Sequence, residues 1–280
     1  MISLLLSTGS LWLLSLIAAP TSLNLDVKSG RLSISTPEEV GEDAISVNCQ
    51  NGERLGAVRI LFEKMGAQAS DIAIEKFNKV DNLVLRKQGK SEELIVIGAH
   101  YDIATLGCGA IDNWSGIVAM AHVYRSVRDL PMEKTLIFVA FGKEEKGLIG
   151  SRAMAAAIDK VQLRQYCAMI NLDSLGLGKP QVLENLSSKK LTVRVGEIAH
   201  RMHMPFAAAN IELGNSDSSS FLERKIPSVT IHGLAGDFSK VIHTVHDQPK
   251  FVKSDSVYLG YRLALSVIVD IDKCSCDEFR

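Results

Sequence analysis

Residues 94–102 read LIVIGAHYD, an apolar run that ends in a histidine and, two residues later, an aspartate. Residues 135–141 (TLIFVAF) and 167–172 (CAMINL) are similar runs, and residues 228–232 (SVTIH) read as a further strand. Short runs that are apolar throughout are typical of strands covered on both faces, as in the parallel sheets of α/β proteins. We therefore expect these segments to form the centre of one sheet.

Segments with helical spacing of apolar residues separate these runs. The expected helices span residues 53–66, 114–127, 149–158, 191–202 and 254–271, and a further strand at 82–86 precedes a turn at 88–91. Alternation of strands and helices predicts an α/β domain whose sheet is covered on both faces. No linker is evident between residues 37 and 272, so we expect a single domain.

The composition excludes several classes of protein. The chain has 280 residues, of which 46% are hydrophobic and 22% charged, so we do not expect a disordered, collagen-like or coiled-coil protein. Lys plus Arg number 31 and Asp plus Glu number 32, so no basic surface for a nucleic acid is expected. The five cysteines are too few for a disulfide scaffold, and none lies in a CxxC pair that could hold zinc.

The N-terminal residues are predicted to lie outside the folded domain. Residues 1–22 combine an apolar run with a small-residue end, which is typical of a secretory signal peptide, although no basic residue precedes the run. The same segment could instead be a membrane anchor or a buried first element. Residues 23–36 read as a polar tether, residues 37–272 as the domain and residues 273–280 as a C-terminal tail. We expect an exported protein, secreted or periplasmic, that could associate with a membrane through its N-terminus.

Export would place the cysteines in an oxidising compartment, where some of them could pair. Because five is an odd number, at least one cysteine stays free or pairs between chains. Cys108 could be a disulfide partner at the rim of a pocket, but we expect it to be a buried small residue.

Residues that could bind a metal ion lie where the predicted strands end. They are His100, Asp102, Glu144, Glu145 and Asp173, with His243 in the loop after the last strand and Asp112 in a glycine-rich turn before a helix. Sites in open α/β sheets form outside the carboxyl ends of the strands, so these groups can converge. Each has an ordinary alternative, as a helix N-cap, a solvated acid or a hydrogen-bonded structural histidine. Together, imidazoles and carboxylates suit zinc, and also cobalt or manganese.

The sequences around these residues resemble the M28 family of zinc aminopeptidases. Five blocks occur in the family's order: GAHYD at 98–102, GAIDNWSG at 109–116, Glu144-Glu145 followed by Gly147 and Gly150-Ser151, NLDSLG at 171–176, and His243-Thr244 with Asp247. The resemblance spans roughly residues 50–270. It implies a three-layer αβα sandwich with a mixed, mostly parallel central sheet, and two zinc ions per chain held close together.

The resemblance also implies a role for each predicted ligand. Asp112 would bridge the two zinc ions. His100 and Asp173 would complete one site, and Glu145 and His243 would complete the other. Three protein ligands for each ion leave a position open for water or substrate, as catalysis requires.

Two further residues would serve the chemistry. Glu144 would be the general base that takes a proton from water and passes it to the leaving amine. Asp102 would accept a hydrogen bond from the ring of His100 and so fix its tautomer. The implied activity is hydrolysis of the N-terminal peptide bond, so the expected partners are peptide substrates.

Residues 215–221 (NSDSSSF) depart from the family pattern, because Ser218 stands where the family often has a histidine after the aspartate. Asp217 could still line the substrate pocket. His243 is the expected ligand rather than His246, since His243-Thr244 with Asp247 matches the family's block.

The sequence contains little information on specificity. Residues 177–190 and 204–240 are expected to supply the loops of the pocket. An apolar first residue of the substrate is a mild expectation, because these loops include Phe206, Phe221 and Phe238.

Three other functions stay open. A glutaminyl cyclase of this fold would bind one zinc ion and catalyse an intramolecular acyl transfer. A carboxypeptidase would need an arginine for the substrate carboxylate, and the sequence shows no convincing candidate. A non-catalytic module would have lost ligands, whereas all five are present here.

Overall fold

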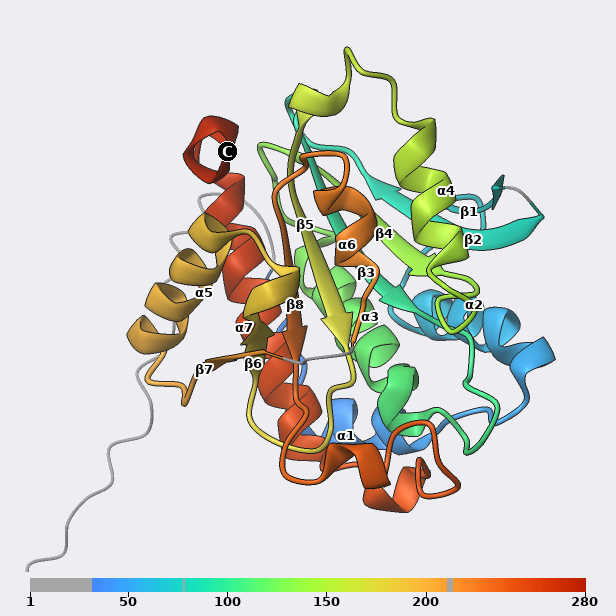
Figure 1. The fold of residues 1–280 in the computed structure, drawn as a ribbon. Helices are drawn as coiled ribbons and strands as arrows, with labels where there is room; N and C mark the ends of the chain where they lie inside the picture. Colours follow the sequence, from blue (N-terminus) through green and yellow to red (C-terminus); the bar gives the residue numbers. More distant parts are fainter. Residues whose placement is uncertain (1–31, 78, 211–213) are drawn as a thin grey trace, which may run out of the picture.

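The structure is a computed structural model that describes residues 32–77, 79–210 and 214–280. The predicted signal peptide or anchor at residues 1–22, and most of the predicted tether, lie outside the described residues. The described chain forms a single α/β domain in three layers, with a mixed, mostly parallel sheet between two layers of helices (Figure 1). The predicted fold class is therefore confirmed.

The sheet has eight strands within the described residues, in the spatial order β1-β2-β4-β3-β5-β8-β6-β7. β3, β4, β5 and β8 run parallel to one another, whereas β2 is antiparallel to β4 and β6 is antiparallel to β8. The carboxyl ends of the four central strands therefore meet at one edge of the sheet. The bounds are β1 (Ile72–Phe77), β2 (Val80–Lys87), β3 (Leu94–His100), β4 (Thr135–Phe141), β5 (Tyr166–Asp173), β6 (Gln181–Leu183), β7 (Ala207–Ala209) and β8 (Ser228–His232).

Helices cover both faces of this sheet (Figure 1). Core contacts place α1, α2, α3, α5 and α7 on one face and α4 and α6 on the other. Within the described residues the α-helices are α1 (Pro37–Ile45), α2 (Arg54–Lys64), α3 (Ser115–Val127), α4 (Ile149–Ala157), α5 (Lys189–Arg201), α6 (Ser218–Leu222) and α7 (Ser254–Asp272).

The two-faced burial of the central strands explains their continuous apolar sequence. In β4, Leu136 and Phe138 join the core beneath α3 and α7, whereas Ile137 and Val139 join the core beneath α4 and α6. All four side chains are fully buried. Because successive strand residues point to opposite faces, a strand between two helical layers must be apolar at every position.

The predicted strands and helices between residues 53 and 271 are confirmed, with ends that differ by a few residues. β2 and β3 flank the turn at residues 88–91 but do not pair, because β4 lies between them. The spacing of apolar residues did not predict α1, although Thr36 and Glu39 form a capping box at its start. It also missed α6 and the strands β1, β6 and β7, which are short or lie toward the edges of the sheet.

Residues on both sides of the predicted domain boundaries pack onto the domain. Ser35, in the predicted tether, is buried, and its Oγ lies 2.7 Å from Nδ1 of His122 in α3. Phe279, in the predicted tail, is also buried. The packed structure thus includes residues on both sides of the predicted domain, residues 37–272.

Two disulfides join distant parts of the chain, Cys49–Cys108 and Cys167–Cys276. The expectation that Cys108 is an unpaired buried residue was therefore wrong. Its side chain is buried, as expected, but it is bonded to the segment that precedes α2. Cys274 is the unpaired cysteine among the described residues.

None of the helices in the described part of the chain is long and apolar enough to cross a membrane.

Candidate metal centre

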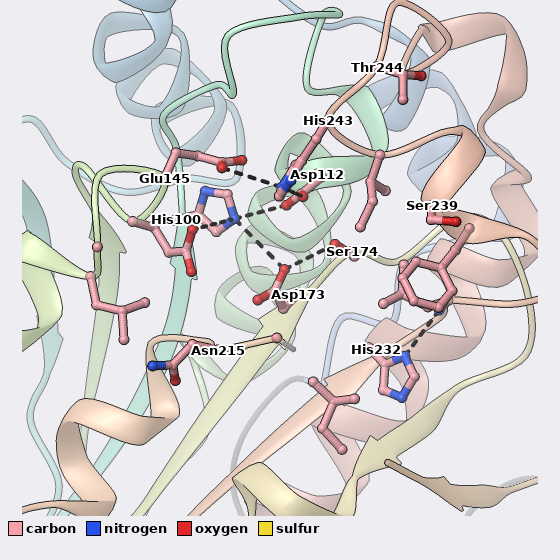
Figure 2. Close-up of a pocket in the computed structure, with 18 of the residues that line it drawn as sticks. His100, Asp112, Glu145, Asp173, Ser174, Asn215, His232, Ser239, His243 and Thr244 are labelled. Carbon is pink, nitrogen blue, oxygen red and sulfur yellow. Dashed lines mark hydrogen bonds and ion pairs between the residues drawn. The ribbon is translucent and has the colours of Figure 1, made fainter. Parts of the chain in front are cut away.

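The strand ends bring the predicted metal-binding residues together at one edge of the sheet. His100 is the last residue of β3 and Asp173 is the last residue of β5, its hydrogen-bonded neighbour. Glu144 and Glu145 follow β4 in the turn before α4. Figure 2 shows the side chains meeting from separate elements, among them His100, Asp112, Glu145, Asp173 and His243.

Asp112 lies between two groups of side chains. Its Oδ1 lies 3.0 Å from Nε2 of His100, and its Oδ2 lies 3.0 Å from Nε2 of His243. Asp173 is 3.7 Å from Nε2 of His100, and Glu145 is 3.3 Å from Nε2 of His243. Each group holds three potential ligand atoms within 4.8 Å of one another. The side chains thus form two adjacent groups, each of which could hold a metal ion, and the carboxylate of Asp112 belongs to both.

An irregular turn presents Asp112. The turn, η2 (Ala110–Trp114), has non-helical backbone angles at Asp112 and Asn113, so Asp112 does not act as the N-cap of α3. The carboxylate of Asp247 accepts hydrogen bonds from the backbone N–H groups of Ile111 (2.7 Å) and Asp112 (3.1 Å). Gly109 begins the turn at φ +61°, where a Cβ would lie only 2.9 Å from the backbone oxygen of Asp112.

A buried arginine ties this turn to the end of β3. Arg54 of α2 is fully buried and donates to the backbone oxygens of Tyr101 (3.1 Å), Asn48 (2.7 Å) and Gly109. Burial lowers the pKa of Arg54 to about 10, although nearby carboxylates oppose the shift. The sequence offered no signal for this residue, because nothing local distinguishes a buried arginine from a solvated one at the start of a helix.

Asp102 has a wider role than the predicted contact with His100. One of its carboxylate oxygens lies 3.6 Å from Nδ1 of His100, longer than an ordinary hydrogen bond. The two oxygens instead accept hydrogen bonds from the backbone N–H groups of Glu144 (2.9 Å) and Glu145 (3.2 Å). Asp102 therefore holds the turn that carries both glutamates against the end of β3.

Hydrogen bonds also orient Asp173. Ser174 Oγ donates to one carboxylate oxygen at 3.1 Å, and Ser216 Oγ donates to the other at 2.5 Å. Asn171 Nδ2 donates in turn to Ser216 Oγ at 2.6 Å. Ser216 lies in the segment that departs from the M28 pattern, so this segment supports the site even without the histidine.

Charge is concentrated in the site. Burial alone would lower the pKa of His100, but neighbouring carboxylates, Glu144 first among them, hold it well above its usual range. Hydrogen bonds to Asp112 and Glu145 raise the pKa of His243 to about 11. Burial, with the charges of nearby acids, raises the pKa of Glu144 well above its usual range, against the opposing effect of His100. Buried carboxylates that crowd two imidazoles in this way form a strong cation-binding environment.

The site opens into a cavity of about 680 Å³ (Figure 2). The candidate metal-binding side chains line one part of it. The other part has a mainly apolar wall that includes Leu148, Leu183, Leu234, Phe238 and Ile242. Arg152 of α4 also lines the cavity. Its position depends on how α4 packs on the sheet, which the local sequence does not reveal.

Some of the residues that were expected near the pocket line the cavity, and others do not. Asp217 does not line the cavity among the described residues but is fully buried beside it, and burial raises its pKa to about 7. His246 packs against Phe251 rather than entering the cavity. Of the three candidate pocket phenylalanines, Phe238 lines the cavity, whereas Phe221 is a core residue and Phe206 packs against the core beside α5.

The class of protein follows from a match to a known family. The sequence model described as peptidase family M28 matches residues 82–267, which include all the candidate ligands and most of the sheet. The chain belongs to peptidase family M28.

Individual relatives are more distant. Aminopeptidase YwaD of Bacillus subtilis (strain 168) is 28% identical over 138 residues, which cover 49% of this chain and 30% of the relative. BSAP, a zinc aminopeptidase from Bacillus subtilis, has a similar structure with a TM-score of 0.62 and 21% identity, covering 71% of this chain and 54% of that one. A glutaminyl cyclase from an Acidobacteriales bacterium has a TM-score of 0.70 at 18% identity, covering 87% of this chain and 96% of that one. At these identities the structural likenesses show a shared fold. The chain spans only 30% to 62% of the length of the curated relatives it matches.

Proposed function

We propose that the protein is a metal-dependent aminopeptidase that hydrolyses the N-terminal peptide bond of peptides at a dinuclear zinc site. The observation that carries the proposal is the pair of three-ligand groups that share Asp112. Membership of peptidase family M28 supports the hydrolytic reaction. The names of the relatives support the choice of the amino end.

The side chains fit zinc. Each group offers an imidazole and two carboxylates, a nitrogen and oxygen set that zinc accepts with a position left for substrate. His100, Asp112 and Asp173 would hold one ion, and Asp112, Glu145 and His243 would hold the other. Among the described residues, Oε1 of Glu145 is buried without a hydrogen-bond partner, and Nε2 of His100 faces the carboxylates of Asp112 and Asp173, so both side chains present an atom to the candidate metal positions. When bound, zinc would lower the pKa of a water molecule and polarise the scissile carbonyl.

Glu144 would act as the general base. Its Oε2 lies 4.0 Å from Nε2 of His100, so the carboxylate is beside the ligand groups, whereas Glu145 next to it contacts His243. The raised pKa of Glu144 suits a group that takes a proton from water and returns it to the leaving amine. Asp102 would position this base, since it holds the backbone of Glu144.

The test combines zinc content with turnover. We expect about two zinc ions per chain after purification without chelator, and hydrolysis of leucyl peptides but not of their N-acetylated forms. Glu144→Gln should lower kcat by about 10²- to 10⁴-fold while zinc content stays the same. Full activity in Glu144→Gln would refute the role of the base, and cleavage of acetylated peptides from the carboxyl end would indicate a carboxypeptidase.

A glutaminyl cyclase is the second candidate, because the fold match to the Acidobacteriales enzyme covers nearly the whole of both chains. The two reactions give different products from a peptide that begins with glutamine. An aminopeptidase releases free glutamine and shortens the peptide, whereas a cyclase leaves an N-terminal pyroglutamyl peptide with loss of ammonia. Mass spectrometry separates these outcomes. About one zinc ion per chain would also favour the cyclase. A lack of both products in zinc-loaded protein would favour a non-catalytic module.

Export is part of the proposal, and the two disulfides support it, because such bonds persist mainly in oxidising compartments. Thiol titration of the unfolded, unreduced protein from its native source should find one free thiol, that of Cys274. Five free thiols would contradict export. Whether residues 1–22 are cleaved can be read from the N-terminus of the same sample.

A further inference from the structure

Arg152 is a positively charged residue on the cavity wall whose ion pair within the described protein is weak. It lies in α4, and its side chain is about half exposed. Among the described residues, its ion pair is with Glu223, at 4.0 Å between Nη2 and Oε1, and the glutamate side chain is 63% exposed. A pair of this length between exposed side chains contributes little free energy. The guanidinium is therefore available to a ligand in the cavity.

The charge balance of the cavity points to the kind of ligand. Among the residues that the structure describes, four carboxylates line it, those of Asp112, Glu144, Glu145 and Asp173. The two divalent ions of the proposed site would compensate these four negative charges. Arg152 is the only lysine or arginine among the described residues that line the cavity, and its one ion-pair partner there, Glu223, is 4.0 Å away and does not line the cavity. A peptide held at the metal centre would meet this charge along the same cavity.

We propose that Arg152 is a specificity-determining residue that binds a carboxylate of the substrate, so that the preferred substrates are short or acidic peptides. This inference rests on the proposed aminopeptidase function and names its substrate class. A guanidinium can bind a carboxylate through two parallel hydrogen bonds, which combine charge and geometry. The carboxylate could be the C-terminus of a dipeptide or tripeptide, or the side chain of an acidic residue near the cleaved bond.

Equilibrium binding tests the inference without requiring turnover. Zinc-loaded Glu144→Gln protein is titrated with Leu-Gly and with its C-terminal amide, and then with Leu-Glu-amide and Leu-Gln-amide. We expect the member of a pair that carries the carboxylate to bind roughly fivefold to tenfold more tightly. A preference within the first pair would show that the bound carboxylate is the C-terminus, and a preference within the second pair would show that it is an acidic side chain.

Substitutions then assign the preference to Arg152. In the Glu144→Gln background, Arg152→Gln should bind acid and amide equally, and Arg152→Lys should retain part of the preference. Lys146→Gln is the matched control. It removes an exposed positive charge from the neighbouring turn, at a residue outside the cavity lining, and should keep the full preference. Comparison of acid and amide within each variant cancels general effects on folding and zinc binding.

Turnover of the wild-type zinc enzyme gives a second readout. A carboxylate bound alike in the ground and transition states should lower KM and leave kcat unchanged. The inference is overturned if neither pair shows a preference, if no peptide binds, or if the preference survives Arg152→Gln. If binding shows the preference but wild-type protein releases no amino acid, the aminopeptidase function fails while carboxylate recognition stands.

Discussion

The two halves of the candidate metal site are built in different ways. The first half, His100 and Asp173, stands on the last residues of two paired central strands. The second half, Glu145 and His243, stands on loops. The side chain of His100 is 1% exposed, whereas that of His243 is 58% exposed. The residue that both halves share, Asp112, stands on the turn η2, and its carboxylate contacts His100 and His243 (Figure 2).

This difference shows that strand ends and loops hold candidate metal-binding side chains in place by different means. The backbone of the strand half is fixed by sheet hydrogen bonds, and Asp173 is oriented by two serine hydroxyls. His243 instead adopts a left-handed conformation, with φ +58°, which is unfavourable for a residue with a side chain. Its imidazole is placed by contacts to Asp112 and Glu145. We therefore expect the strand half to be the more preorganised zinc site and the loop half to be the weaker one.

The largest effect is expected from the residue that the halves share. Asp112→Asn should lower zinc content from about two ions per chain to fewer than one, because a bridging carboxylate is lost from both halves. Hydrolysis should fall below detection. Elemental analysis of the purified variant checks the zinc content, and circular dichroism checks that the fold is retained. Two tightly bound ions in this variant would show that Asp112 does not bridge.

The same contrast explains what the sequence could predict. β3, β4 and β5 are apolar along most of their length because helices cover both faces, so His100 and Asp173 could be placed at the ends of such runs from sequence. The conformation of η2 depends on Asp247, more than 130 residues away along the chain, and on buried Arg54. Contacts of this kind leave no local pattern. Position after a predicted strand made Glu145 and His243 candidates, and the resemblance to M28 proteins implied their pairing at one ion, but neither supplied the supporting contacts or the place of Arg152 on the cavity wall.

Single histidine substitutions distinguish the halves directly. His243→Ala should retain about one zinc ion, held at the strand half, because two carboxylates alone make a poor zinc site. His100→Ala should also lose an ion, and we expect the remaining one to dissociate more readily because it occupies the loop half. Zinc affinity is measured by competition with a chelator of known affinity.

His246→Ala provides the matched control for His243→Ala. It removes an imidazole from the same loop, at a residue that packs against Phe251 and does not line the cavity in the described structure. It should keep two ions. Equal affinity of the remaining ion in His100→Ala and His243→Ala would contradict the division into a strong and a weak half.

Zinc binding should depend on pH through both histidines. The neighbouring carboxylates raise the pKa of His243 to about 11 and hold that of His100 well above its usual range, so both imidazoles are biased toward the protonated form in the metal-free protein. A metal ligand must be the neutral imidazole, so each ion displaces a proton and zinc affinity falls as pH falls. Calorimetry in buffers of different ionisation enthalpy should find about one proton released per histidine ligand. Binding without proton release would show that the imidazoles are not ligands.

The smallest effects are expected from residues that support the ligands. Ser216→Ala removes one hydrogen bond from Asp173 and should weaken the strand-half ion by about tenfold. Asp247→Asn should have the larger effect of the two, up to about 100-fold, because a neutral amide offers one acceptor where the carboxylate serves the N–H groups of Ile111 and Asp112. Loss of the Asp247 carboxylate also removes a contact between the loop of His243 and η2, so binding of the loop-half ion should weaken more than binding of the strand-half ion.

Burial raises the pKa of Asp247 to about 6, above that of an unfolded aspartate, and this gives an independent check. Between about pH 4 and 6 the folded chain keeps a proton that the unfolded chain has lost, so this group's contribution to the free energy of unfolding falls as pH rises through that range. Asp247→Asn should remove that slope in metal-free protein, whereas Ser216→Ala should keep it. If both variants weakened the two ions equally, the supporting contacts would act on the site as a whole, and the contrast between its halves would lie in burial alone.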